Sequence, residues 1–269
     1  MELFIQTEQG EVIDTSSFFK LSVFEPSSPK RNLSLQDIEG RRGSLVTSNA
    51  LTTRTVLVEC LFIARDKSDF ILKRDETFVL FDSDIPYYII DSRQPFKRWK
   101  VSCDGFDAEY TRNRVGKITL NFTAIDGMSE STGSTLSPLS FDSETWGIGQ
   151  NLLNDDNGYI FTNRNFKIYN AGDIEVDPRE KPLIITFKGS SDGLTIRNNT
   201  TGEYWRYSGS TNSYDTITLD QVFSRKNDAS IFNDTNRKSV KLLKGWNEFT
   251  ISGTTSAFEI AFDFRFYYL

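Results

Sequence analysis

The sequence predicts a mainly β protein with two domains. Aromatic residues make up 13% of the chain, and 22 of them are phenylalanine. Aromatic and β-branched side chains favour strands. Several segments alternate apolar and polar residues with a period of two, the pattern of a strand with one buried face. With 269 residues, the chain is long enough for two domains that each bury a core.

Two segments in the first half of the chain have patterns typical of strands. Residues 54–64 (RTVLVECLFIA) are apolar at nearly every position, which predicts a strand covered on both faces. Residues 117–126 (KITLNFTAID) alternate apolar and polar side chains, which predicts a strand with one buried face. Both segments belong to a first domain that we expect over residues 1–127.

One segment of this domain, ARDKSDFILKRD, predicts a short helix near residues 66–74. Asp66 can accept hydrogen bonds from the first turn as its cap, and Asp69 adds a negative charge there. Lys73 and Arg74 suit the negative end of a helix dipole. The helix is therefore expected to end close to these two cations.

A polar segment separates the two domains. Residues 128–140 contain glycine, serine, threonine and proline in place of an alternating pattern, which predicts a linker. In the second domain, residues 141–269, PLIITFKG after Lys181 predicts a strand that begins with a proline. The alternating end of the chain, AFEIAFDFRFYYL, predicts a last strand with one buried face, so this domain is expected to be a β-sandwich or jelly roll.

The composition excludes several classes of function. The chain has no histidine, which removes His-dependent triads, histidine metal sites and imidazole acid-base catalysis. Cys60 and Cys103 allow at most one disulfide. The net charge of −6 argues against general affinity for nucleic acids. No stretch approaches the about 20 apolar residues of a membrane span, and no secretion signal is visible, so we expect cytosolic synthesis, no cofactor and no membrane insertion.

The stretch DIEGRRGSL is the first candidate site, with Gly40, Arg41, Arg42 and Gly43 at its centre. A phosphate loop would need a Gly-Lys-Ser/Thr sequence that does not follow, and a nucleic-acid contact would need a wider basic stripe with aromatic residues. Two interpretations stay open. The stretch is either a solvated turn whose glycines supply positive φ angles or a contact with a neighbouring protein.

Three carboxylates form a second candidate site in GDIEVDP. Asp173, Glu175 and Asp177 have a spacing of two, so on a strand they would share a face and could bind a hard cation or act as an acid-base pair. A solvated strand face is the alternative. Asp155 and Asp156, in NDDNG, lack the remaining spacing of a calcium site and predict a loop.

A pair of aromatic residues is the third candidate. In TTGEYWRYSG, Trp205 and Tyr207 would share one face of a strand and could stack on a glycan. One face of any sandwich strand is buried, however, and the alternative is that both belong to the core.

The order of these features resembles one family as a whole. The segments FKLSVFEPSSPKRNLSLQDIEGRRGSL, RTVLVECLFIA, ETFVLFDSDIPYYII and ITLNFTAIDG, followed by a β-rich second half ending in FEIAFDFRFYYL, are similar to the distal tail proteins of siphophages that infect Gram-positive bacteria. Glu39 and Arg42 stand where that family has proline and aspartate, so no role of that aspartate carries over. The resemblance spans nearly the full length and contains no catalytic signature.

The resemblance implies a fold and a function. The first domain would be a tail-tube-like β-barrel or sandwich that closes into a hexameric ring, and the second a galectin-like or carbohydrate-module-like β-sandwich. The ring would join the major tail tube protein to the tail-associated tip protein at the tail tip of the virion. The second domain would hold receptor-binding proteins or host cell-wall glycans.

Two further expectations follow. DNA would pass through an acidic lumen without specific binding, and strand edges of the first domain would pair between neighbouring subunits. The alternatives to a non-enzymatic structural protein are a carbohydrate-binding module or lectin, resting on Trp205 and Tyr207, and a glycosidase, resting on the three carboxylates of GDIEVDP.

Overall fold

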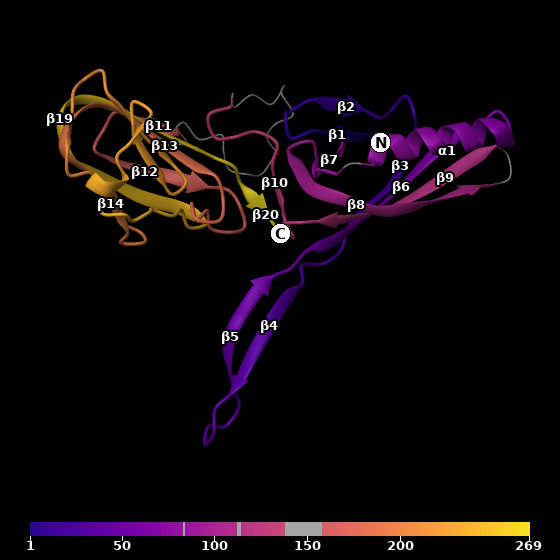
Figure 1. Ribbon diagram of the computed structural model, residues 1–269, viewed down its shortest axis with the longest axis horizontal. Coiled ribbons are helices and arrows are strands. Elements are labelled where there is room, and N and C mark those ends of the chain that lie inside the picture. Colours follow the sequence, from indigo (N-terminus) through magenta and orange to yellow (C-terminus); the bar gives the residue numbers. More distant parts are fainter. Residues whose placement is uncertain (83, 112–113, 138–157) are drawn as a thin grey trace. The chain divides into compact units, whose positions relative to one another are not determined.

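The computed structural model of the protein describes residues 1–82, 84–111, 114–137 and 158–269 (Figure 1). The chain forms two compact units: unit 1 contains Met1–Glu130 together with Leu269, and unit 2 contains Ser131–Tyr268. The mainly β class is confirmed, because strands follow one another throughout the described residues and one α-helix, α1, accompanies them.

Unit 1 is built on one antiparallel sheet with the strand order β2-β1-β7-β8-β9-β6-β3. The end strands β2 and β3 do not pair with each other, so the sheet is open and no closed barrel forms within the described residues. Its strands are β1 (Leu3–Gln6), β2 (Val12–Asp14), β3 (Lys20–Pro26), β6 (Arg54–Ile63), β7 (Tyr87–Asp91), β8 (Lys97–Tyr110) and β9 (Val115–Ala124).

The predicted strand at residues 117–126 is confirmed as β9, the strand between β8 and β6. Ile118, Leu120, Phe122 and Ala124 are fully buried, whereas Asn121 is exposed. The expectation that residues 54–64 are covered on both faces is wrong. Strand β6 alternates between buried and accessible positions, because only one face of the sheet is packed against the helix.

Helix α1 (Lys67–Phe81) covers that packed face (Figure 1). The predicted cap is confirmed, since the Asp66 carboxylate accepts hydrogen bonds from the backbone N–H groups of Ser68 (2.8 Å) and Asp69 (2.9 Å). The predicted end near residue 74 is wrong. The helix continues to Phe81, whose ring packs on the core, and tertiary packing overrides the strand propensity of the segment TFVLF.

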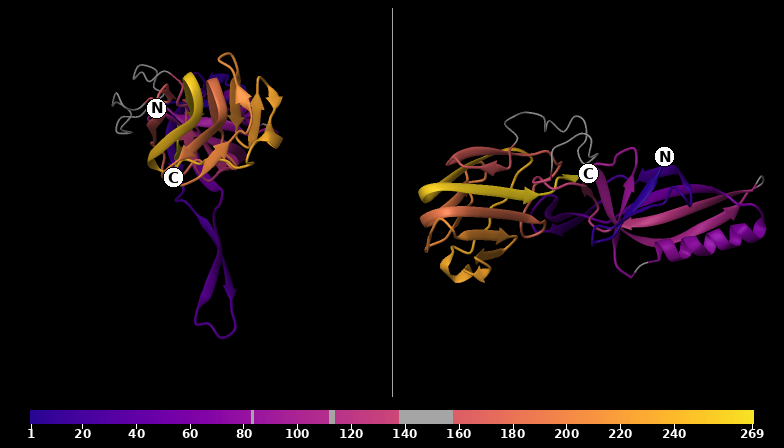
Figure 2. Two further views of the ribbon diagram at one scale, coloured as in Figure 1. Left: turned by 90° about the vertical axis from the view of Figure 1, so that its left-hand side faces the viewer. Right: turned by 90° about the horizontal axis from the view of Figure 1, so that it is seen from above.

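A second sheet, made of two strands, projects from unit 1. Strands β4 (Arg31–Asp37) and β5 (Ser44–Leu51) form an antiparallel hairpin that extends away from the rest of the unit (Figures 1 and 2). Every residue of β4 and every residue of β5 except Leu51 is exposed. The hairpin therefore contributes no core to this unit.

Unit 2 is organised by two long antiparallel strands that run side by side (Figure 2). They are β13 (Leu183–Asn198) and β19 (Gly245–Phe264), and shorter strands flank them. The flanking strands are β11 (Ile160–Phe161), β12 (Asn165–Asn170), β14 (Tyr204–Arg206), β15 (Ser210–Thr211), β16 (Thr216–Asp220), β17 (Phe223–Lys226) and β18 (Ala229–Ser230), and β20 (Tyr267–Tyr268) ends the unit.

Breaks in the ladder let the two long strands bend. The register of β13 against β19 shifts between Gly189 and Thr195, and two glycines make this possible. A Cβ atom at Gly189 would lie 2.7 Å from Phe258 Cβ, and one at Gly253 would lie 2.6 Å from the Gly193 carbonyl oxygen. The strands on either side of the bend form two layers, because β14 reaches β17 through a hydrogen bond from Trp205 Nε1 to Ser224 Oγ (3.2 Å).

The predicted buried face at the end of the chain is confirmed. Its members are Phe258, Ile260, Phe262, Phe264, Phe266 and Tyr268, all of them buried. The strand is not continuous, however. It stops at Phe264, and the Arg265 guanidinium donates hydrogen bonds to the carbonyl oxygens of Ser131 and Thr132 before β20 begins.

The predicted linker at residues 128–140 is described only in part. Strand β10 (Ser129–Ser131) pairs with β8, and residues 138–140 lie outside the described residues, as do Asp155 and Asp156 of the predicted loop. The division into domains 1–127 and 141–269 stays a prediction. No described helix is long and apolar enough to cross a membrane.

We predict that Asp66→Ala destabilises unit 1 by about 1 kcal/mol, because the first turn of α1 loses its cap. Urea unfolding of the full chain would measure the change. Asp75→Ala is the matched control: Asp75 is exposed within the same helix and pairs with Arg74 on the helix surface, so its loss should cost less. An equal decrease in the free energy of unfolding for the two variants would contradict a capping role for Asp66.

Candidate functional site

The predicted Gly-Arg-Arg-Gly site lies at the tip of the β4–β5 hairpin. Gly40 and Gly43 have φ angles of 81° and 77°, and the backbone N–H of Arg41 donates to the carbonyl oxygen of Ile38 (3.1 Å). The predicted turn with positive φ angles is confirmed. Arg41 and Arg42 are exposed and form no ion pair with any described residue.

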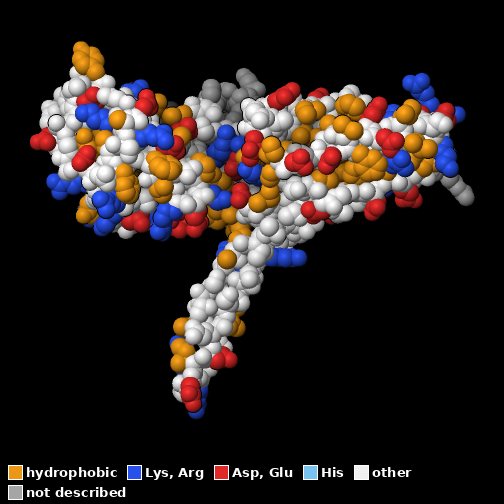
Figure 3. Space-filling model, in the orientation of Figure 1, with side chains coloured by type: hydrophobic (Ala, Val, Ile, Leu, Met, Phe, Trp, Pro, Cys, Tyr) orange, Lys and Arg blue, Asp and Glu red, His pale blue; other side chains and the backbone are white. Residues whose placement is uncertain are grey.

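Exposed apolar side chains follow this tip down both strands of the hairpin (Figure 3). Leu35 and Val46 lie opposite each other in the ladder, and their side chains are 56% and 54% exposed. The full set is Leu33, Leu35, Ile38, Leu45 and Val46. A two-stranded hairpin is at best marginally stable alone in water. Large apolar side chains gathered on such an exposed segment are typical of a surface that contacts another chain. We call these five residues the hairpin stem.

A second apolar surface lies on the outer side of α1. Ile71 and Phe78 lie on one row along the helix and Leu72 and Val79 on the adjacent row, since residues seven apart share a face, and Val79 is 80% exposed. Phe78 stacks on Phe106 of β8 with 4.7 Å between ring centroids. A hollow of about 480 Å³ lies between the C-terminal end of α1 and β8. We call the four helix residues the α1 stripe.

Part of the sheet face opposite α1 is acidic. This part is formed by β3, β6, β9 and the part of β8 that pairs with β9, and Asp104 joins it through a hydrogen bond from Thr123 Oγ1 (2.6 Å). Lys100, where β8 pairs with β7, lies on the same face outside this part and is paired with Glu8 (2.7 Å). Five carboxylates stand against two lysines: Glu25, Glu59, Asp104, Asp107 and Glu109 against Lys20 and Lys117. Lys117 is already paired with Glu59 (2.6 Å).

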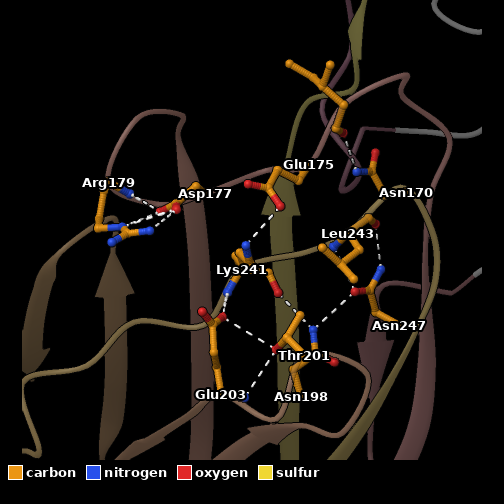
Figure 4. A network of polar contacts seen from close by, with 11 residues as sticks. Asn170, Glu175, Asp177, Arg179, Asn198, Thr201, Glu203, Lys241, Leu243 and Asn247 are labelled. Carbon is orange, nitrogen blue, oxygen red and sulfur yellow. Dashed lines mark hydrogen bonds and ion pairs between the residues drawn. The ribbon is translucent and has the colours of Figure 1, made fainter. Parts of the chain in front are cut away.

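The structure does not bring the three predicted carboxylates of unit 2 together. Their segment is not a strand, and each carboxylate has its own cation. Figure 4 shows the pairs of Glu175 and Asp177. Asp173 pairs with Lys244, Glu175 with Lys241 (3.0 Å) and Asp177 with Arg179. Within the described part of the chain, no group of three or more acidic or cysteine side chains could hold a metal ion. The shared-face prediction is therefore wrong.

Trp205 and Tyr207 are buried in unit 2, with 2% and 7% of their surface exposed. Their rings stack with 6.5 Å between centroids, and the indole N–H is satisfied by Ser224. The prediction that they contact a glycan or a partner is wrong, because neither ring is accessible. The core alternative is the observed one.

Both cysteines are free thiols. Cys60 is fully buried in the core of unit 1, and burial raises the pKa of its thiol to about 12. Cys103 is partly accessible, and burial likewise raises its pKa. Raised pKa values leave both thiols protonated at neutral pH, which makes them poor nucleophiles.

The hairpin stem and the α1 stripe were not found from the sequence. A signal for the stem was present, because Leu33 and Leu35 alternate with polar residues on one side of a glycine turn and Leu45 follows on the other. The α1 stripe had no such signal. Its apolar residues resemble those of a buried helix face, and only the packing of Phe70 and Phe81 decides which side faces the sheet.

Comparison with known proteins finds one family model that matches most of unit 1. Residues 8–124 match the family model described as the phage tail protein RIFT-related domain. The match spans 117 of the 269 residues and makes this part of the chain similar to that family. The matched residues include the hairpin, α1 and the acidic face of the sheet. No curated protein matches the chain.

Beyond the RIFT-related domain, the whole chain has the fold of a known hub protein. The Dit protein of phage SPP1, described as a paradigm of the hub adsorption apparatus in phages infecting Gram-positive bacteria, is similar with a TM-score of 0.69. The match has 14% identity and covers 98% of this chain and 99% of that chain. The resemblance to distal tail proteins is thus confirmed by family for the RIFT-related domain and by fold for the chain.

Two structures of the phage p2 baseplate in its activated conformation, with strontium and with calcium, also match. Their TM-scores are 0.45 and 0.43, with 8% and 9% identity. The matches cover 98% and 97% of this chain, and 97% of each baseplate chain. These scores are too low to establish a shared fold.

We predict that the ion pair of Asp177 is structural and titrates accordingly. Hydrogen bonds from the Arg179 guanidinium hold the pKa of Asp177 below its ordinary value. A lowered pKa stabilises the fold above the unfolded-state pKa of about 3.9, and this contribution is lost as the pH falls through the folded-state pKa.

Urea unfolding of wild type and Asp177→Asn at several pH values would test this. The wild type should be more stable at pH 7, and the difference should shrink as the pH falls below about 4. Glu248→Gln, which removes an exposed pair with Lys167, serves as control and should change stability little. A difference for Asp177→Asn that stays constant with pH would contradict the assignment.

Proposed function

We propose that the chain is a structural hub protein of a siphophage tail tip. It forms a hexameric ring that joins the major tail tube protein to the tail-associated tip protein, and its second unit supports receptor-binding proteins. The fold shared with SPP1 Dit supports this proposal, and the RIFT-related domain supports a place in the virion tail. The proposal assigns no catalytic activity to the chain.

The hairpin stem is the observation that most directly supports the proposed ring. Four large apolar side chains stand on two strands that pair only with each other among the described strands, and the fifth, Ile38, lies in the turn between them. Each exposed edge also presents backbone N–H and C=O groups to solvent, which is a template for pairing with another chain. A neighbouring subunit that packs against the stem would bury the apolar residues and satisfy the free edge at once.

The α1 stripe supplies a surface of a different kind. A ring requires a heterologous interface, in which one surface of a subunit meets a different surface of the next. The hairpin stem and the α1 stripe are two distinct apolar surfaces on the same domain, so each subunit offers both sides of such an interface. Repetition around an axis closes the ring.

The acidic face fits the passage of DNA. In the proposed ring, the face of the sheet opposite α1 lines the lumen, and its excess of carboxylates repels the phosphate backbone. DNA leaving the virion would therefore pass without being held. This arrangement keeps the α1 stripe, on the other side of the sheet, away from the lumen and available to protein neighbours.

Substitution of the hairpin stem tests the ring directly. We expect Leu35→Ser with Val46→Ser to stay at the mass of one chain, 30.8 kDa, at concentrations where the wild type assembles, because the covered apolar surface is lost. Light scattering over a concentration series, with negative-stain microscopy, measures this. Tyr214→Ser, at a side chain 94% exposed in unit 2, is the control and should assemble normally.

Two results would contradict the hub proposal. One is a wild-type chain that stays monomeric even when the tail-associated tip protein is present. The other is a stem variant that assembles as the wild type does while its melting temperature is unchanged.

The two arginines at the hairpin tip are expected to contact a neighbouring subunit or tail protein. We predict that Arg41→Ala with Arg42→Ala weakens ring or tail assembly, and that the loss is partly rescued by lysine at both positions, because the positive charge returns. Assembly titrations at low and high salt measure the effect, since salt screens exposed charges. Unchanged assembly would make the tip a plain solvated turn.

A further inference from the structure

One layer of unit 2 has an outward face with no assigned role. It is formed by β12, the first part of β19, the last part of β13, and β14. Residues alternate cleanly between the core and this face, so Phe249 and Ile251 are buried whereas Thr250 and Ser252 are accessible. We call the outward residues of these four strands, with Lys238 beside them, the polar face.

Cations that form no ion pair with a described residue distinguish this face. Arg197 lies opposite Tyr204 in the ladder, and Arg206 lies opposite Thr195. Arg197, Arg206 and Lys238 are exposed and form no ion pair with any described residue. The four fully described strands place one carboxylate on the face, Glu248, which already pairs with Lys167 (2.9 Å).

Aromatic rings stand among these charges. The Tyr204 ring has the Arg197 guanidinium 5.8 Å and the Lys238 ammonium 5.1 Å from its centroid. Farther along the face, Trp246 is 40% exposed and lies opposite Tyr169, with 5.0 Å between ring centroids. Exposed rings with a polar rim provide the flat apolar contact that the faces of sugar rings use.

Amides and hydroxyl groups fill the space between the rings and the cations. Thr250 Oγ1 donates to Asn165 Oδ1 and accepts a hydrogen bond from Asn199 Nδ2, both at 2.9 Å. These groups keep further donor and acceptor capacity toward solvent. Sugar hydroxyl groups, which both donate and accept, suit such a row.

A buried network holds the face rigid from below (Figure 4). Asn198 Nδ2 donates to Asn247 Oδ1 (3.1 Å) and to the Lys241 carbonyl oxygen (2.8 Å), while Asn247 Nδ2 donates to the Leu243 carbonyl oxygen (2.8 Å). Asn198 and Asn247 are fully buried. Satisfied buried polar groups fix the strands that carry the exposed residues, so the face needs little ordering before it binds.

We infer that the polar face binds an anionic polysaccharide. Arg197, Arg206 and Lys238 would pair with its carboxylate or phosphate groups, and Trp246 and Tyr204 would stack on its sugar rings. The core of a protein interface is depleted of charge, which does not fit this face. General nucleic-acid binding does not fit the chain's net charge of −6. The inference concerns unit 2 alone and holds whether or not unit 1 forms a ring.

Titration of the full chain with defined polymers tests the inference. The probes are polygalacturonate, which carries carboxylates, a phosphomannan, which carries phosphates, neutral dextran, and inorganic polyphosphate, which has charge without sugar. We expect binding to at least one anionic polysaccharide, weakened by added salt, and much weaker binding to dextran and polyphosphate. The two anionic polysaccharides tell a carboxylate ligand from a phosphate ligand.

Variants locate the site. Arg197→Gln with Lys238→Gln should weaken binding about tenfold or more, since hydrogen bonds to charged groups contribute strongly, and Trp246→Ala should weaken it as well. Lys188→Gln with Arg225→Gln is the matched control. It removes two exposed cations whose register places them on the outward face of the other layer, and it should leave the affinity unchanged.

Three outcomes would overturn the inference. They are no binding to either anionic polysaccharide, equal binding to polyphosphate, and equal losses in the polar-face and control variants. Melting curves of all variants show that the fold is kept, since every changed side chain is exposed. Light scattering on the same samples reports assembly separately, so failure of glycan binding is distinguishable from failure of the hub proposal.

Discussion

Stacked phenylalanine rings hold α1 on the sheet of unit 1, and the rest of that unit depends on this contact. Phe70 stacks on Phe62 with 5.6 Å between centroids, and Phe81 stacks on Phe19 (5.8 Å) and meets Phe122 edge to face. One helix can cover only one face of the sheet. The opposite face is therefore left to solvent, and the charges that the sequence distributes over several strands collect on it.

In unit 2, two bent strands replace the helix as the organising element. The glycines at positions 189 and 253 let β13 and β19 depart from a regular ladder, so that one ribbon contributes to two layers. Trp205 then becomes a core residue that links the layers, and the accessible aromatic residues are found elsewhere on the unit. Trp205 and Tyr207 are buried because their side of the sheet faces inward, whereas Trp246 and Tyr169 are accessible because theirs faces outward.

The sequence predicted what local patterns determine. Alternation identified β9 and the buried end of the chain, and the charge pattern identified Asp66 as the cap of α1. Patterns of a few residues could not show where α1 ends, because Phe81 is held by rings that are distant in the sequence. They also could not separate Trp205 from Trp246, since both lie in strand-like segments and only the pairing of strands decides which side is buried. The predicted grouping of Asp173, Glu175 and Asp177 failed because it assumed a strand where the chain turns.

In the proposed ring, the exposed hairpin also sets a requirement on the order of events during assembly. Until a neighbouring subunit covers the hairpin, the hairpins of other free copies can contact it through the same exposed edges and apolar side chains. These contacts compete with the productive one. Polar residues such as Ser34, Ser48 and Asn49 on its strands weaken such contacts without abolishing them. The chain is therefore best kept dilute or engaged soon after synthesis, so that productive assembly is faster than the accidental pairing of free copies.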